Sequence, residues 1–424
     1  MLCRRGLIAR VVWPGMDTVT VRCFLVIALF QVSLGLQPRR FFATTVAGLE
    51  TVLLQEIRSL PGVLNPKIEM GGVSFSGFPV VGYHTVIESR TALKVLEVIG
   101  QSGGLSCPDS LYEFARGCPW KELIGPDQTL KCDAVASPSV DRSLSHTHFT
   151  SLTVKNAICD ELLKVRGSRP FIDKERADVN ILTFLSADRC IIYRVWSGTS
   201  SLHKRGYRAD SVQHKAALRE TTAAGIVLLA GWNQSMSETH VFVDPMCGSG
   251  TIPIEAALIA CDTAPGLIRE RPTTLIDVGQ GDWKDAYQYA QNRDSRSKTQ
   301  TVEIFANDMS EGAVALAKQC ALKAGVAHLV KWSVSDVSDF RVVSRTKKIL
   351  GVTNPPWDMR LTENAEESWS KLGVWSKNTL PGCSIWTLSG EPKMPRHFGI
   401  KPSGFVALNA ANVDSRLLCY NIDS

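Results

Sequence analysis

The sequence lacks several features that would define its class at once. Its twelve cysteines include no C-x-x-C pair and have no close histidine partners. This excludes a zinc-ribbon pattern and a disulfide framework, and it predicts reduced, mostly buried thiols and no metal site. Charge is also scarce: residues 1–40 supply +5 of the net charge of +6, so residues 41–424 carry only +1. Residues 41–424 as a whole therefore carry too little positive charge to attract nucleic acid, so any RNA-binding surface must be a local basic patch.

No apolar run reaches the ~20 residues that a membrane-spanning helix needs. The longest candidate, residues 23–36, is broken by polar and small residues and follows an Arg-rich start. We therefore predict that residues 1–40 are a targeting segment, of the signal type or an Arg-rich presequence with Met16 as a second start. The unpaired cysteines fit secretion poorly, so the expected destination is a plastid or mitochondrion, with the cytoplasm as the alternative. We expect no membrane association of the mature form.

The composition, with 44% apolar and 21% charged residues over a length of 424, indicates a globular chain of two or three domains. Residues 240–258 carry its most informative pattern. A short apolar run ends at Asp244, glycines follow at 248 and 250, and apolar residues then recur at helical spacing. The pattern predicts a strand, a glycine turn and a helix whose first N–H groups face a ligand. An ordinary tight turn would explain the glycines alone.

A second motif, residues 353–357, follows about a hundred residues downstream. Its two prolines predict a stiff turn that closes a strand. The Asn354 side-chain oxygen and the Pro355 carbonyl could accept hydrogen bonds from an exocyclic amine, while the Trp357 ring stacks on a base. A surface turn is the alternative. A glycine turn followed by this motif is typical of amino-group methyltransferases that use S-adenosylmethionine.

The combined motifs resemble the bacterial-type ribosomal RNA guanine-N2 methyltransferases that carry a THUMP RNA-binding domain. The resemblance runs from about residue 41 to residue 422 and rests on six stretches: 42–50, 202–208, 244–257, 264–266, 307–308 and 354–357. It implies an α/β fold in which an α+β THUMP-containing RNA-binding region precedes a doubly wound, Rossmann-like class I methyltransferase domain. The implied boundaries are a targeting segment at 1–40, an α+β subdomain at 41–103, the THUMP domain at 104–200 and the methyltransferase domain at 201–424.

Two local predictions go with these boundaries. Apolar spacing over 84–100 predicts the second helix of the α+β subdomain. The polar stretch 263–299 predicts an irregular insertion in the methyltransferase domain.

The resemblance implies S-adenosylmethionine as cofactor and RNA as partner. Asp308, at the end of a predicted strand, is expected to bind the ribose hydroxyls. Asp336 is expected to accept the adenine amine, although it could equally cap the following turn. The full set of expected cofactor residues is Asp244, Pro245, Met246, Gly248, Gly250, Thr251, Asp308 and Asp336. The catalytic loop is Asn354, Pro355, Pro356 and Trp357.

Basic residues in two stretches are the candidate RNA contacts. Acidic neighbours make a mixed, solvated face an equal alternative for those in the THUMP region. Arg205 and Arg208 are as consistent with structural ion pairs as with phosphate contacts. The candidates are Lys155, Arg166, Arg169, Lys204, Arg205 and Arg208.

The predicted reaction is methylation of the guanine N2 amine in large-subunit ribosomal RNA, after the base is flipped out of its helix. The alternatives are a transfer RNA guanine-N2 methyltransferase and an inactive RNA-binding protein of ribosome assembly. Trp357 stands where Tyr or Phe is usual, and Asp358-Met359 replaces the usual Gly-Glu. The chain reaches residue 424 without the second methyltransferase domain of some bacterial fusions, which predicts a single activity.

Overall fold

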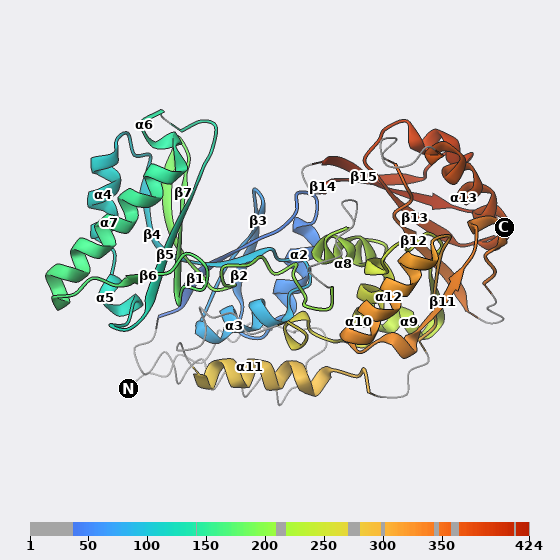
Figure 1. The fold of residues 1–424 in the computed structure, drawn as a ribbon, viewed down its shortest axis with the longest axis horizontal. Coiled ribbons are helices and arrows are strands. Elements are labelled where there is room, and N and C mark those ends of the chain that lie inside the picture. Colours follow the sequence, from blue (N-terminus) through green and yellow to red (C-terminus); the bar gives the residue numbers. More distant parts are fainter. Residues whose placement is uncertain are drawn as a thin grey trace, which may run out of the picture.

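The computed structural model describes residues 37–140, 142–208, 218–269, 280–297, 302–342, 347–357, 364–410 and 413–423. They form two modules, each built on one sheet (Figure 1). Most of the predicted targeting segment, residues 1–36, lies outside them. No helix among the described residues is long and apolar enough to cross a membrane.

The N-terminal module contains a sheet whose eight described strands run in the order β2-β3-β1-β4-β8-β7-β5-β6. Strand β4 pairs with β1 on one side and with β8 on the other, so the sheet continues across the boundary predicted at 103. Helices α4 and α7 cover its β5–β7 end (Figure 1). The elements are β1 (Arg39–Thr44), α2 (Glu50–Ser59), β2 (Leu64–Glu69), β3 (Gly72–Gly77), α3 (Pro79–Glu88), β4 (Lys94–Gly103), α4 (Pro108–Arg116), α5 (Trp120–Leu123), β5 (Thr129–Ala136), α6 (Arg142–Ser145), α7 (Thr147–Arg166), β6 (Phe171–Ile172), β7 (Val179–Leu185) and β8 (Arg189–Val195).

The helix predicted over 84–100 is wrong in its second half. Helix α3 ends at Glu88, and β4 begins at Lys94. Val95 packs in one hydrophobic cluster with Phe41, whereas Leu96 packs in another with Tyr193. A strand buried on both faces has consecutive apolar residues, and over a short stretch this cannot be told from a helix by spacing.

The C-terminal module contains a sheet of seven described strands in the order β11-β10-β9-β12-β13-β15-β14. The first five are parallel, and β15 runs antiparallel to both neighbours. The elements are α8 (Glu220–Leu229), α9 (Gln234–Thr239), β9 (His240–Asp244), α10 (Thr251–Ala260), η1 (Pro265–Leu267), α11 (Gln280–Arg293), β10 (Ile304–Asp308), α12 (Glu311–Ala324), η3 (Ala327–Leu329), β11 (Val330–Val334), η4 (Val337–Asp339), β12 (Lys348–Thr353), α13 (Ala365–Thr379), β13 (Ser384–Ser389), η5 (Met394–Phe398), β14 (Gly404–Ala410) and β15 (Val413–Asn421).

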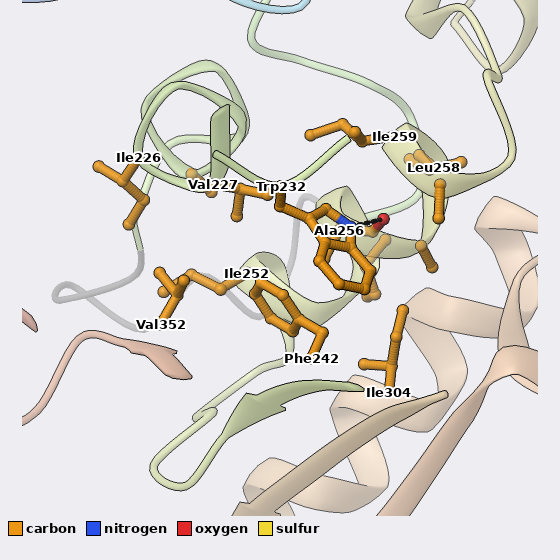
Figure 2. Packing of buried hydrophobic residues seen from close by; sticks show 14 of the residues in the cluster. Ile226, Val227, Trp232, Phe242, Ile252, Ala256, Leu258, Ile259, Ile304 and Val352 are labelled. Atoms are coloured by element: carbon orange, nitrogen blue, oxygen red, sulfur yellow. Dashed lines mark hydrogen bonds between the residues drawn. The ribbon is translucent and has the colours of Figure 1, made fainter. Parts of the chain in front are cut away.

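Strand β9 is buried on both faces, as a doubly wound sheet requires. Phe242 packs among residues of α8, α10 and the neighbouring strands, and Figure 2 shows it beside Trp232, Ile252 and Ile304. The Trp232 indole donates to the Ala256 carbonyl at 2.9 Å, which joins α10 to the chain that leads into β9. Val241 and Val243 face the opposite cluster, with Trp369 of α13. The strand that leads to the predicted glycine turn is thus packed on both faces.

The segment predicted as an irregular insertion contains helix α11, which lies along α3 of the N-terminal module (Figure 1). Its buried face carries Trp283, Ala286 and Ala290, and the Trp283 ring meets Tyr83 edge-on at 5.9 Å. These residues are spaced by three and four, so the sequence carried a helix pattern. The many polar residues around them obscured this pattern in the sequence. The insertion therefore joins the two modules.

Candidate active site

The predicted site residues converge at one edge of the C-terminal sheet. Asp244 and Asp308 end β9 and β10, and Asp336 and Asn354 follow β11 and β12. These four strands are parallel neighbours, so their carboxyl ends share an edge. Strand β9 has β10 on one side and β12 on the other, which makes this the switch point where open α/β sheets bind ligands.

Asp244 is fully buried at this edge. Its Oδ1 accepts from the Met246 amide at 3.2 Å. The Thr353 hydroxyl interacts with this carboxylate, although neither that hydroxyl nor Asp244 Oδ2 makes a well-formed hydrogen bond within the described part of the chain. Burial, aided by the charge of Asp308, raises the pKa of the Asp244 carboxyl to about 7. A buried acceptor with free capacity is a candidate ligand-binding atom.

The two turn glycines have different roles. Both have left-handed backbones, with φ +52 at Gly248 and +79 at Gly250. A Cβ at Gly250 would lie 2.7 Å from the Ala317 Cβ, so this glycine lets the turn pack on α12. A Cβ at Gly248 would meet no atom within 4 Å. Only Gly248 therefore leaves open space where a ligand could approach. Thr251 begins α10 and is buried.

Asp308 is connected directly to the glycine turn. Its Oδ2 accepts from the Gly248 amide at 2.8 Å, and its Oδ1 accepts from the Ser310 amide at 2.9 Å. The carboxylate thus lies beside the open space at Gly248. A half-buried acidic group at the end of the second strand is suited to bind a pair of hydroxyls.

Asp336 has the capping contact that was the alternative prediction. Its Oδ1 accepts from the Ser338 amide at 2.9 Å, and its Oδ2 accepts from the Lys371 ammonium at 2.9 Å. The hydrogen bond from Ser338, with that from Lys371, lowers the pKa of this carboxyl. Both oxygens already have a partner, so binding of an adenine amine would have to share one of them.

The loop predicted to be catalytic, residues 354–357, has a hydrogen bond between two of its own side chains. The Trp357 indole N–H donates to the Asn354 Oδ1 at 3.1 Å. The Pro356 carbonyl accepts from the Trp369 indole of α13 at 2.9 Å, which fixes the turn. A Cβ at Gly390 would lie 2.7 Å from the Trp357 ring, so that ring packs on the backbone beyond β13. The atom predicted to accept the target amine therefore has an internal partner. The altered positions Asp358-Met359 lie outside the described residues.

One residue at this edge had no predicted role. Asn307 is fully buried and hydrogen-bonds to the turn after β9 and to the loop after β11. One of its partners is the carbonyl of Pro245. The sequence signal was its position directly before Asp308.

The structure separates the RNA candidates. Arg205 is 0% exposed, pairs with Glu255 at 3.5 Å and donates to two carbonyls, so a phosphate contact at this residue is wrong. Arg208 pairs with Glu220 at 3.5 Å and donates to the Leu218 carbonyl, which favours the structural alternative.

The remaining RNA candidates belong to two groups. Arg166 donates to the carbonyls of Ile124 and Gly125, and Lys155 is half-buried. Lys204 and Arg169 are exposed, although Arg169 also pairs with Asp160. Only these last two present a cation outward.

Three family models match the chain. They are the RlmL ferredoxin-like domain over residues 40–96, the THUMP domain over 108–195 and the RMKL-like methyltransferase domain over 205–398. The chain thus combines a THUMP domain with a methyltransferase domain of the RMKL-like type. Its N-terminal module therefore contains the THUMP domain, and its C-terminal module is a Rossmann-like methyltransferase domain.

Known relatives agree with these matches. Ribosomal RNA large subunit methyltransferase K/L of Syntrophotalea carbinolica is 33% identical over 391 residues, 91% of this chain and 54% of that protein. The protein of the same name from Cellvibrio japonicus is 31% identical over 91% of this chain and 51% of its own length. The methyltransferase chain thus spans about half the length of these relatives.

Solved structures share the whole fold. A Listeria monocytogenes protein, described as a predicted N6-adenine-specific DNA methylase, is 28% identical, with a TM-score of 0.80 over 92% of this chain and 98% of its own. SMU.472, solved in complex with S-adenosylhomocysteine (SAH), has a TM-score of 0.79 at 23% identity over 92% of this chain and 99% of its own.

The site has the groups that S-adenosylmethionine, the cofactor expected from the sequence, would need. The space beside Gly248 gives room for a ligand, and the adjoining Asp308 carboxylate can accept from hydroxyls. The Asp244 carboxylate, whose Oδ2 has no well-formed hydrogen bond among the described residues, can accept from a cationic group. Among the described residues there is no cluster of three His, Cys, Asp or Glu that could hold a metal, and the ten described cysteines are free.

Proposed function

We propose that this protein methylates the N2 amine of a guanine in large-subunit ribosomal RNA. One observation carries the proposal: Asn354 follows β12 directly beside the glycine turn that follows β9. The register pairs Gly351 with Val243, so both motifs leave the sheet at the same edge. An acceptor for the target amine and a space for the cofactor at one edge of the sheet support methyl transfer between a bound cofactor and a bound base.

The chain's own contribution is positioning. Bound S-adenosylmethionine supplies a methyl group activated by its sulfonium. Asn354 Oδ1 and the Pro355 carbonyl would accept from the target amine and orient its lone pair. The Trp357 ring would stack on the base, which offsets part of the cost of flipping it out of a helix. The proton of the amine then leaves to solvent.

The choice of ribosomal RNA rests on the THUMP domain and on the names of the relatives. Two exposed cations, Lys204 and Arg169, could contact phosphates. An amine clamp does not by itself choose guanine over adenine or ribosomal over transfer RNA, so the experiment must compare these substrates.

The test is transfer of labelled methyl groups onto unmodified large-subunit ribosomal RNA and a transfer RNA pool, with nucleoside analysis of the product. We expect label on guanine N2 of ribosomal RNA, and loss of that label in Asn354→Ala with SAH affinity retained. Label on transfer RNA or on an adenine would overturn the proposed substrate. Binding of SAH without any transfer would instead favour a role in ribosome assembly.

The Arg-rich composition of residues 1–40 supports a further proposal, that the protein works in a plastid or mitochondrion. Imaging of the tagged full-length chain tests it. A signal confined to the cytosol would contradict it.

A further inference from the structure

Asn307 lies at the centre of the hydrogen bonds that join three strand ends of the methyltransferase sheet. It is the next-to-last residue of β10 and is 0% exposed. Its Nδ2 donates to the carbonyls of Pro245 at 3.2 Å and Ser335 at 3.0 Å. Its Oδ1 accepts from the hydroxyls of Ser333 at 2.8 Å and Ser335 at 3.0 Å. Both amide hydrogens and both lone pairs of the oxygen are used.

The backbone of the same residue adds another bond. The Asn307 carbonyl accepts from the Cys247 amide at 2.8 Å, in the turn that leads to Gly248. Asn307 also stands opposite Ser333 in the parallel pairing of β10 with β11. A single residue thus connects the turn after β9, the end of β10 and the loop after β11.

Each connected segment carries a candidate cofactor residue. Pro245 directly follows Asp244, Ser335 directly precedes Asp336, and Asn307 itself precedes Asp308. We infer that Asn307 is a positioning residue of the cofactor site, which sets the separation of these three carboxylates without contacting the cofactor. The inference rests on the proposed function, because it assigns the strand ends to S-adenosylmethionine.

Only an amide fits these contacts. Aspartate has the same shape but, when ionised, has no hydrogen to donate to the carbonyls of Pro245 and Ser335. Alanine leaves those two carbonyls without their side-chain donor and removes the amide oxygen that accepts from the Ser333 and Ser335 hydroxyls. In either variant the strand ends lose a direct connection, and a displacement near 1 Å is enough to weaken a site.

The experiment measures SAH binding by calorimetry, and thermal unfolding with and without SAH, on the full chain. We expect Asn307→Asp and Asn307→Ala to weaken SAH binding by at least about tenfold, with KM for S-adenosylmethionine raised more than kcat is lowered. Asn180→Ala is the matched control. Asn180 is also buried, at 2% exposure, but lies in β7 of the N-terminal module. This variant should leave SAH affinity unchanged.

Ser333→Ala is a milder variant in case the Asn307 variants do not fold. It removes one of the two hydroxyls that donate to Asn307, and we expect SAH binding about two- to tenfold weaker. SAH affinity equal to wild type in a folded Asn307 variant, or in Ser333→Ala if neither folds, would overturn the inference. A wild-type protein that does not bind SAH would overturn the proposed function and this inference with it.

Discussion

The indole N–H of Trp357 donates a hydrogen bond to the side-chain oxygen of Asn354 at 3.1 Å. A Phe ring at this position could not make this bond, because it has no N–H group. Trp357 therefore restrains the Asn354 side-chain oxygen, which is the proposed acceptor for the target amine. A target amine has to displace the indole or share the oxygen with it.

This relationship predicts different effects for two substitutions at Trp357. Trp357→Phe keeps a stacking face and frees the Asn354 oxygen, so methyl transfer should stay within about tenfold of wild type. Trp357→Ala also removes stacking, worth about 1–3 kcal/mol per base, and should lower kcat/KM by about 10- to 100-fold. Single-turnover transfer measures both. Equal losses in the two variants would show that the stacking face contributes nothing.

The two turn glycines should respond differently to alanine. Gly250→Ala combines a left-handed backbone with a 2.7 Å contact to Ala317, so we expect a loss of more than about 2 kcal/mol in the free energy of unfolding. Gly248→Ala should lower the free energy of unfolding by only about 1–2 kcal/mol, the cost of a left-handed backbone at a residue with a Cβ atom. Its methyl group enters the open space beside the turn, so SAH binding should weaken by at least about tenfold. Urea unfolding and calorimetry separate the effects; tight SAH binding by Gly248→Ala would place the cofactor elsewhere.

Arg205 and Lys204 are adjacent in sequence but should differ in effect. Arg205→Ala removes the ion-pair partner of the buried Glu255 carboxylate, to which the Tyr207 hydroxyl still donates, and we expect a loss of about 3–5 kcal/mol in the free energy of unfolding. Lys204→Ala replaces an exposed side chain and should alter the free energy of unfolding by less than about 0.5 kcal/mol. Only Lys204→Ala can report a phosphate contact, as weaker RNA binding with a reduced salt dependence. Denaturant unfolding and RNA titration at two salt concentrations provide the measurements.

Asp244 should make stability depend on pH. Its pKa is raised to about 7 in the folded protein, against about 3.9 in an unfolded chain. Between about pH 4 and pH 7 the folded state binds more protons, so this group lowers stability as pH rises and has no further effect above its folded pKa. Asp244→Asn removes this contribution. The stability of the variant relative to wild type should therefore increase from pH 5 to pH 8; a difference that stays constant would show that Asp244 is ionised throughout.

The sequence by itself determined the local chemistry of this protein. The strand before Asp244, the glycine turn, helix α10 and the loop at Asn354 all follow from periodicity and turn residues, because those patterns are written within a few consecutive positions. The order of the motifs along the chain indicated the family. The spacing of apolar residues gave wrong predictions in two places. Strand β4 was predicted as helix because distant segments bury both of its faces, and helix α11 was missed because polar residues separate its apolar ones.

Only the tertiary structure decided which groups become partners. Arg205 reads as a surface cation in a basic stretch, yet it is buried against Glu255 of α10. Asp336 meets Lys371 of α13, and Asn307 meets two loops at once. These contacts join segments far apart in the chain, and the order of strands in the sheet brings them together. The energy of such a pair depends on burial and geometry, which a residue's own neighbours in sequence do not specify.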